Sequence, residues 1–248
     1  MGRIQHRKKV IRSKRWKRLL LLCVAAGCAL LSAFITLRIY AQIVGAPIIQ
    51  VPISSVFLDS QGNVIGDRFE DQRRYWISLE EMSPFLPQAT VAVEDQEFYE
   101  HHGFDYSRIA GAILKDIKAG KKVEGASTIT QQYARNLFLT HEKSWTRKIN
   151  EALYAYRLEL FYDKDELLEG YLNTVYFGHG MYGVEAASRF YFGKSAKSLT
   201  LAESALLVGI PKGPTYYSPL VNEEKAVNRQ QLIVTLMEIQ QKITTDQK

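Results

Sequence analysis

The feature that most constrains this chain is an uncharged apolar stretch near its N-terminus. The 19 residues from Leu19 to Leu37 carry no charged side chain, and Arg38 ends the run. As a helix, such a stretch is about 28 Å long, which matches the hydrocarbon core of a bilayer. We therefore predict one membrane-spanning helix over residues 19–37. A cleaved signal peptide is the alternative, although its apolar core is usually shorter, about 7–15 residues.

The charge distribution gives this helix a direction. Nine of the 32 lysines and arginines lie within residues 1–18, which contain no acid. Residues 19–248 contain the remaining 23 bases and all 26 acids, so they carry a net charge of −3. The positive-inside rule places the basic tail in the cytoplasm and everything after the helix on the other side of the membrane. The same distribution argues against a nucleic-acid-binding surface.

Beyond the helix, the sequence patterns predict a mainly α domain. Residues 41–52 are apolar, contain two prolines and indicate an extended linker, and residues 56–65 indicate a small β-hairpin. Helical periodicity or helix-start signals follow. We expect helices after Asp105, over residues 145–161, from Leu167, after Thr200 and over 222–241. The predicted organisation is a basic tail (1–18), a membrane helix (19–37), a linker with the hairpin (38–78) and an α domain (79–248).

Glu94 opens the first segment that could carry chemistry, Glu94–Gly103. It follows the apolar residues 89–93. A carboxylate at the end of a buried segment has a raised proton affinity and suits general base catalysis. The alternative is a solvated acidic turn in which His101 only packs or caps.

Two further segments offer cations and hydroxyl groups. Gly125–Asn136 places Ser127 and Thr128 before a helix with two glutamines and Arg135, which is typical of an anion site at a helix N-terminus. The alternative is an ordinary N-cap with a polar helix face. Arg147 and Glu151 are four residues apart and share a helix face, although a surface ion pair would look the same.

The remaining patterns exclude several kinds of site. The loop Gly178–Gly183 follows no parallel-strand pattern, so it indicates a tight turn and no dinucleotide fingerprint. The sequence has no zinc-ligand spacing such as Cys-x-x-Cys, and no Gly-x-Ser-x-Gly or Ser-x-x-Lys nucleophile motif.

Taken together, these segments resemble the family 51 peptidoglycan glycosyltransferases, the polymerase modules of class A penicillin-binding proteins and their monofunctional relatives. The family motifs E-D-x-x-F-x-x-H-x-G, G-x-S-T-x-x-Q-Q, R-K-x-x-E and L-E-x-Y-L-N stand here in order at residues 94–103, 125–132, 147–151 and 168–173. Arg135 departs from the family, which usually has lysine there. The resemblance covers about residues 80–220 and implies a lysozyme-like, two-lobed, mainly α fold.

The resemblance also implies a reaction and roles for residues. A growing glycan linked to a polyprenyl diphosphate is the donor, and lipid II is the acceptor. The acceptor 4-hydroxyl attacks the anomeric carbon and the lipid diphosphate leaves, giving a β-1,4 link with inversion. Glu94 would be the general base, and Glu151 a second catalytic carboxylate. The substrate-binding residues implied are Asp95, Ser127, Thr128, Gln131, Gln132, Arg135, Arg147 and Lys148.

A cofactor and partners follow from the same resemblance. We expect a divalent cation, Mg²⁺ or Mn²⁺, bridged by the substrate diphosphate with Glu151 as its protein ligand. The expected partners are lipid II, the growing lipid-linked glycan, the membrane and other cell-wall synthesis proteins, with no nucleic acid. The alternatives are a lysozyme-like hydrolase or lytic transglycosylase, which needs no diphosphate site, and an anchored scaffold with a degenerate site.

The segment from Tyr106 to Glu124 is a candidate membrane surface. Ile109, Ala112, Ile113, Leu114 and Ile117 form an apolar face, and four lysines lie beside it: Lys115, Lys118, Lys121 and Lys122. Apolar residues flanked by lysines suit a helix in the lipid headgroup layer. We expect an exposed apolar patch here with weak packing against the rest. The alternative is a core-facing helix with solvated lysines.

Overall fold

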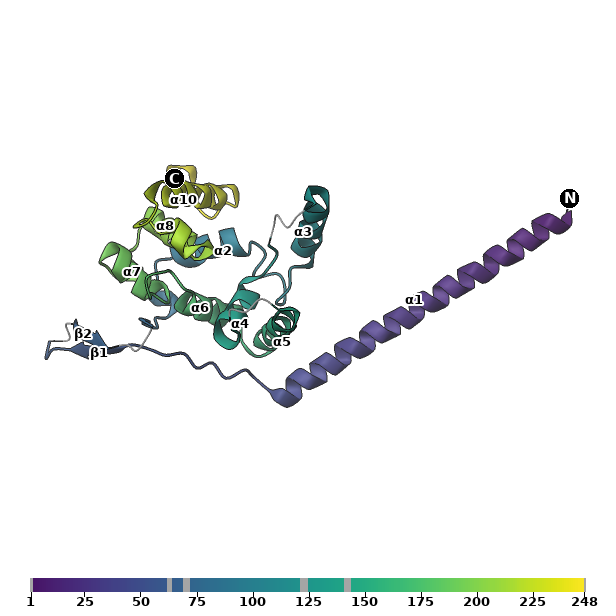
Figure 1. Cartoon of the computed structure of the whole chain (residues 1–248), viewed down its shortest axis with the longest axis horizontal. Coiled ribbons are helices and arrows are strands. Elements are labelled where there is room, and N and C mark those ends of the chain that lie inside the picture. The colour runs from purple at the N-terminus through teal and green to yellow at the C-terminus, as the bar shows by residue number, and fades with distance from the viewer. Residues whose placement is uncertain (1, 62–63, 69–71, 121–124, 141–143, 248) are drawn as a thin grey trace. The chain divides into compact units, whose positions relative to one another are not determined.

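The computed structural model describes residues 2–61, 64–68, 72–120, 125–140 and 144–247. It divides into two compact units, residues 1–46 and 47–248 (Figure 1). The first unit consists mainly of one helix, α1 (Gly2–Val44). Within α1, residues Leu20–Val44 are long and apolar enough to cross a membrane.

Helix α1 continues beyond the expected boundary at Arg38. Residues 38–44 contain no proline or glycine, so nothing in the sequence breaks the helix there. The helix ends where Gly45 adopts a positive φ of 76° and donates its N–H to the carbonyl of Ala41. The extended linker expected from residue 41 therefore begins after Val44.

A small antiparallel sheet opens the second unit. Strand β1 (Ser55–Leu58) pairs with β2 (Val64–Arg68), with Ser55 opposite Arg68 and a shift of register between Phe57 and Leu58. This confirms the predicted hairpin, although residues 62 and 63 of its turn lie outside the described residues. Two isolated bridges, Arg73 with Met181 and Tyr176 with Tyr182, were not foreseen.

Helices make up most of the second unit, which confirms the mainly α prediction. The α-helices are α2 (Phe85–Glu94), α3 (Tyr106–Ala119), α4 (Ile129–Phe138), α5 (Trp145–Phe161), α6 (Lys164–Thr174), α7 (Val184–Phe192), α8 (Leu201–Gly209), α9 (Pro214–Tyr217) and α10 (Glu223–Ile239). Short 3₁₀ turns are η1 (Leu79–Glu81), η2 (Ala196–Ser198), η3 (Ile210–Lys212) and η4 (Thr245–Gln247).

Polar caps decide where several of these helices begin. Asp105 caps α3 by accepting the N–H of Arg108, as predicted. Capping boxes begin α4 (Thr128 with Gln131), α6 (Asp163 with Glu166) and α8 (Thr200 with Glu203). The start predicted at Leu167 for α6 was too late, because the box encloses the first turn and the helix begins at Lys164.

The helices of the second unit pack in two groups around one core. Helices α4, α5 and α6 contact one another, α2, α8 and α10 form the other group, and α7 contacts both α6 and α8 (Figure 1). The largest fully buried side chains are shared between the groups: Tyr133, Phe98, Phe177, Leu86, Ile129, Leu158, Leu167, Leu168, Leu172, Leu207, Ile210 and Ile233. This core fixes the ends of α2, α4 and α5, where the conspicuous motifs lie.

Helix α3 exposes part of its apolar face, whereas Ile109 of that face is half-buried. Ile113, Leu114 and Ile117 are 53%, 60% and 71% exposed, and Ala112 is the helix's buried residue. In Figure 1, α3 stands at the edge of the second unit, away from α8 and α10. The predicted exposed apolar patch is confirmed for these residues, whereas Lys121 and Lys122 lie outside the described residues.

Candidate active site

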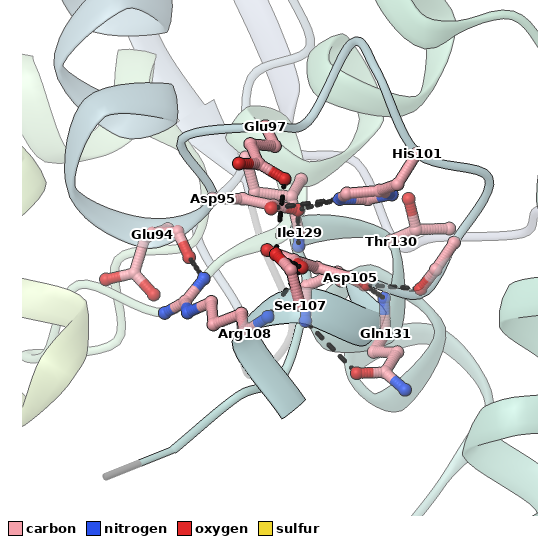
Figure 2. Close-up of polar contacts among 12 residues, drawn as sticks. Glu94, Asp95, Glu97, His101, Asp105, Ser107, Arg108, Ile129, Thr130 and Gln131 are labelled. Atoms are coloured by element: carbon pink, nitrogen blue, oxygen red, sulfur yellow. Dashed lines mark hydrogen bonds and ion pairs between the residues drawn. The ribbon is translucent and has the colours of Figure 1, made fainter. Parts of the chain in front are cut away.

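Glu94 is the last residue of α2 and sits half-buried between α3 and α4. Residues 89–92, shortly before Glu94 in α2, are buried, and their packing fixes the C-terminal end of the helix. The side-chain amide of Gln132 donates a hydrogen bond to Glu94 Oε2 at 2.8 Å. The guanidinium of Arg108 donates to the backbone carbonyl of Glu94 (Figure 2). The predicted base is therefore held through both its main chain and its side chain.

Asp95 joins the first motif to the start of α4. Its buried carboxylate contacts His101 Nε2 at 2.9 Å and accepts the backbone N–H of Ile129 at 2.9 Å (Figure 2). Both contacts are internal to the protein. Asp95, which follows Glu94 in sequence, therefore connects the first motif to the start of the second.

Thr128 and Gln131 are likewise engaged within the protein. Thr128 Oγ1 donates to the carbonyl of Gly103 at 2.8 Å and accepts the N–H of Gln131, whose side chain accepts the N–H of Thr128. Both side chains are buried. The first N–H groups of α4 thus bind Asp95 and Thr128, so an anion here must be held mainly by neighbouring side chains.

Glu151 forms the centre of a cluster of cations. This carboxylate is fully buried. Lys148 donates to its Oε1, and Arg147 and Arg135 lie 3.4 Å and 4.0 Å from its Oε2. Lys148 also donates to Ser127 Oγ at 3.2 Å, which ties the second motif to the third. We call Arg135, Arg147, Lys148 and Glu151 the cation cluster.

The cation cluster carries an excess of two positive charges. The side chains of Lys148 and Arg135 are 43% and 39% exposed, so both reach solvent from a buried anchor. Arg147 Nε is buried and has no hydrogen-bond partner among the described residues. Cationic side chains with an unpaired N–H donor suit an anionic ligand such as a diphosphate.

Glu94 and Glu151 lie along the same side of α4. Gln132 contacts Glu94 and Arg135 contacts Glu151. Because these two α4 residues are three apart, they share a helix face and lie about one turn from each other. The two carboxylates, 57 residues apart in sequence, are therefore brought to one site and not to opposite faces of the domain.

The arrangement around Glu151 does not fit a metal ion. Both carboxylate oxygens already contact cationic side chains. Among the residues that the structure describes, no group of three His, Cys, Asp or Glu side chains could hold a metal. Mg²⁺ and Mn²⁺ prefer several oxygen ligands, which this cluster does not offer. The carboxylate of Glu151 is therefore engaged by the three cationic side chains.

Arg108 was not singled out in the sequence, although the residue that caps its helix, Asp105, was. Burial raises the pKa of Asp105, but hydrogen bonds from the N–H of Arg108 and the hydroxyl of Ser107 lower it more, so its net pKa lies below the usual value. Asp105 is thereby ionised and fixes the first turn of α3, which carries Arg108 (Figure 2). Arg108 gave no signal in sequence because an arginine in an amphipathic helix is usually solvated.

Helix α6 holds the chain that leads into α2. Trp76 donates its indole N–H to Glu169 at 2.9 Å, and Glu169 also accepts the N–H of Leu79. One turn later, Asn173 accepts the N–H of Ile77 and donates to its carbonyl. Glu169 and Asn173 of the fourth motif therefore hold the segment from Trp76 to Leu79 in place.

Comparisons with known proteins show which family the chain belongs to. The profile of the family described as Transglycosylase matches residues 61–238. Penicillin-binding protein 2D of Bacillus subtilis (strain 168) is 59% identical over 88% of this chain and 32% of its own length. Penicillin-binding protein 1F of the same strain is 40% identical over 92% of this chain and 32% of its own.

Relatives from other bacteria also match this chain over only part of their own length. Penicillin-binding protein 1A of Neisseria flavescens is 44% identical over 76% of this chain and 24% of its own length. The chain thus spans about a third or less of these relatives. A crystal structure of penicillin-binding protein 1A from Haemophilus influenzae matches 81% of this chain and 20% of its own, at 22% identity and a TM-score of 0.42.

The described residues of the second unit form a mainly helical fold in which two carboxylates and a cation cluster lie along α4. The profile match covers well over half of the chain, and the chain belongs to the Transglycosylase family.

Proposed function

We propose that this chain polymerises lipid II into β-1,4-linked glycan strands and releases polyprenyl diphosphate. The observation that carries the proposal is the placement of Glu94 and the cation cluster along one face of α4. Such a site offers a base and an anion-binding surface about one helical turn apart. Those are the two groups that glycosyl transfer from a diphosphate requires.

In the proposed reaction, each group has one task. Glu94 accepts the proton of the acceptor 4-hydroxyl as that oxygen attacks the anomeric carbon of the donor. The bond between the anomeric carbon and the diphosphate oxygen breaks, and its electron pair stays with the diphosphate. Arg135, Arg147 and Lys148 stabilise the charge on this leaving group, which is greatest in the transition state. Glu151 keeps the three cations together.

The predicted substrate-binding residues divide into two sets in this proposal. Ser127, Arg135, Arg147 and Lys148 face the diphosphate. Asp95, Thr128 and Gln131 are buried and hold the loop and helix that carry the first set. Asp95 contacts His101 and the N–H of Ile129, and Thr128 and Gln131 contact each other and Gly103. Gln132 orients Glu94.

The membrane anchor and the exposed face of α3 favour a substrate that is linked to a lipid. The apolar helix within α1 would keep the module at the bilayer, with the basic tail in the cytoplasm and the catalytic unit outside. The exposed Ile113, Leu114 and Ile117 of α3, and the 88% exposed Trp145 at the start of α5, would contact the headgroup layer. Other cell-wall synthesis proteins would supply the lipid II.

The experiment offers the full chain two substrates in detergent. Incubation with lipid II is expected to give glycan polymer and free polyprenyl diphosphate. Incubation with finished glycan strands is expected to release nothing. Degradation of the strands without polymer formation would instead establish a lysozyme-like hydrolase or lytic transglycosylase, for which the cation cluster has no evident use. Neither activity would indicate a scaffold with a degenerate site.

A further inference from the structure

A buried tyrosine on α6 contacts the amide that holds Glu94. The hydroxyl of Tyr171 donates to Gln132 Oε1 at 3.3 Å, and Gln132 Nε2 donates to Glu94 Oε2 at 2.8 Å. Tyr171 is 3% exposed. The three side chains come from three different helices, α6, α4 and α2, so the line of contacts depends on how these helices pack.

The two contacts require the same orientation of the Gln132 amide. A glutamine side chain has one end that accepts hydrogen bonds and one that donates them. Donation by Tyr171 holds the oxygen toward α6 and leaves the amino group facing Glu94. If the amide turned over, its oxygen would face the carboxylate, and two acceptors would repel each other.

We propose that Tyr171 is a positioning residue for Glu94, acting through Gln132 to keep a hydrogen-bond donor on the catalytic carboxylate. The inference rests on the proposed role of Glu94 as general base. Tyr171 itself touches no substrate, because its side chain is buried behind Gln132. A donor fixed on Glu94 favours the ionised carboxylate, which is the form that can accept a proton.

Tyr171 stays a donor throughout the working pH range. Burial raises its pKa well above the usual value, and the nearby charge of Glu94 raises it further, whereas Arg135 lowers it. Two further charged groups lie close to Glu94: Arg108 of α3, which binds its backbone carbonyl, and the adjacent Asp95, which contacts His101. Removing the Tyr171 hydroxyl leaves Arg108 and Arg135 in place. A change in the pH dependence of polymerisation would therefore report on the two hydrogen bonds that connect Tyr171, Gln132 and Glu94.

The chain offers a matched control on the neighbouring helix. Tyr133 of α4 is also buried, and its hydroxyl lies against Gly170 of α6, where a Cβ on that glycine would come within 2.2 Å. Tyr133→Phe removes a hydroxyl from the same helix interface without touching the contacts of Gln132. It is expected to lower thermal stability about as much as Tyr171→Phe and to leave the pH profile of polymerisation unchanged.

The test measures lipid II polymerisation by the full chain between pH 5 and pH 9. Tyr171→Phe is expected to lower kcat about tenfold with KM within threefold, since the lost hydrogen bond supports a charged group. The acidic limb of its kcat profile is expected to move to higher pH, because Glu94 then holds its proton more tightly. Gln132→Met should show the same shift, and adding Tyr171→Phe to it should lower kcat no further.

A second substitution guards against misfolding of Tyr171→Phe. Ring-fluorinated tyrosine at position 171 keeps the shape and makes the hydroxyl a stronger donor, so the acidic limb should move to lower pH. An unchanged profile in both position-171 variants, or additive losses in the double variant, would overturn the inference and leave the proposed function intact. A wild-type chain that makes no polymer would overturn the proposed function, and this inference with it.

Discussion

Replacing Glu151 by glutamine tests whether this carboxylate exists to hold the cation cluster together. The change leaves Arg135, Arg147 and Lys148 within a few ångströms of one another without their shared counter-charge. Breaking a buried ion pair usually costs about 3–5 kcal/mol. Because two of the three cations are roughly 40% exposed and screened by water, we expect a smaller loss, about 2–3 kcal/mol.

That loss can be measured as a change in thermal stability. For a domain of this size, 1 kcal/mol corresponds to about 2–4 °C in Tm, so Glu151→Gln should lower Tm by about 5–10 °C. Thermal unfolding of the full chain in detergent, followed by circular dichroism, gives the value. Inorganic pyrophosphate should raise the Tm of the variant more than that of the wild type, because an anion replaces the missing charge.

A surface ion pair provides the control for this measurement. Glu203 pairs with Lys194 at 2.8 Å and is 27% exposed, so Glu203→Gln should cost about 1 kcal/mol or less, including its weakened cap on α8. A Tm for Glu151→Gln equal to that of Glu203→Gln, without any gain from pyrophosphate, would refute the reasoning.

Four further predictions concern Arg135, the exposed face of α3, the Asp105 cap and the role of Mg²⁺. Arg135→Ala should weaken binding of a lipid diphosphate about tenfold in a titration; equal affinity would count against the diphosphate site. Replacing Ile113 and Ile117 by serine should reduce binding of the chain without residues 1–38 to anionic vesicles, and unchanged binding would argue against a lipid contact by α3. Because the pKa of Asp105 is depressed, its contribution to the free energy of unfolding is complete above about pH 4 and is lost as the pH falls further. Asp105→Asn should therefore lower the stability at pH 7 and have less effect at pH 3. An equal loss at both pH values would be inconsistent with an ionised cap. If Mg²⁺ acts with the substrate diphosphate, the Mg²⁺ concentration for half-maximal rate should be the same in Glu151→Gln as in the wild type, whereas a several-fold increase would make Glu151 a metal ligand.

The parts of the fold that local chemistry determines could be predicted from the sequence. Asp105 and the capping boxes at Asp163 and Thr200 mark helix starts because their side chains bind the first free N–H groups. The exposed face of α3 follows from its apolar spacing combined with its lysines. The helix through Arg38 could not be predicted from charge alone, because charge ends an apolar run without ending a helix.

The contacts within the site depended on tertiary packing. The motif at residues 125–132 indicated an anion site, but the sequence could not show that Asp95, from another segment, occupies the first N–H of α4. It could not show that Gln132 turns toward Glu94 instead of toward the cations. Arg108 lies in a helix whose pattern indicates only amphipathic packing, and the motif at residues 168–173 contains Tyr171 without indicating its partner, so both contacts became visible in the structure alone.

The most direct test of the account is the rate of lipid II polymerisation by Glu94→Gln. Glutamine keeps the shape and can still contact Gln132, but it cannot accept the hydroxyl proton, so the rate should fall by about 10²–10⁴ while lipid diphosphate affinity stays within threefold. Glu100→Gln, which changes an exposed acid in the same loop, should polymerise at the wild-type rate. Polymer formation by Glu94→Gln within a few-fold of the wild type would contradict the assignment of the general base.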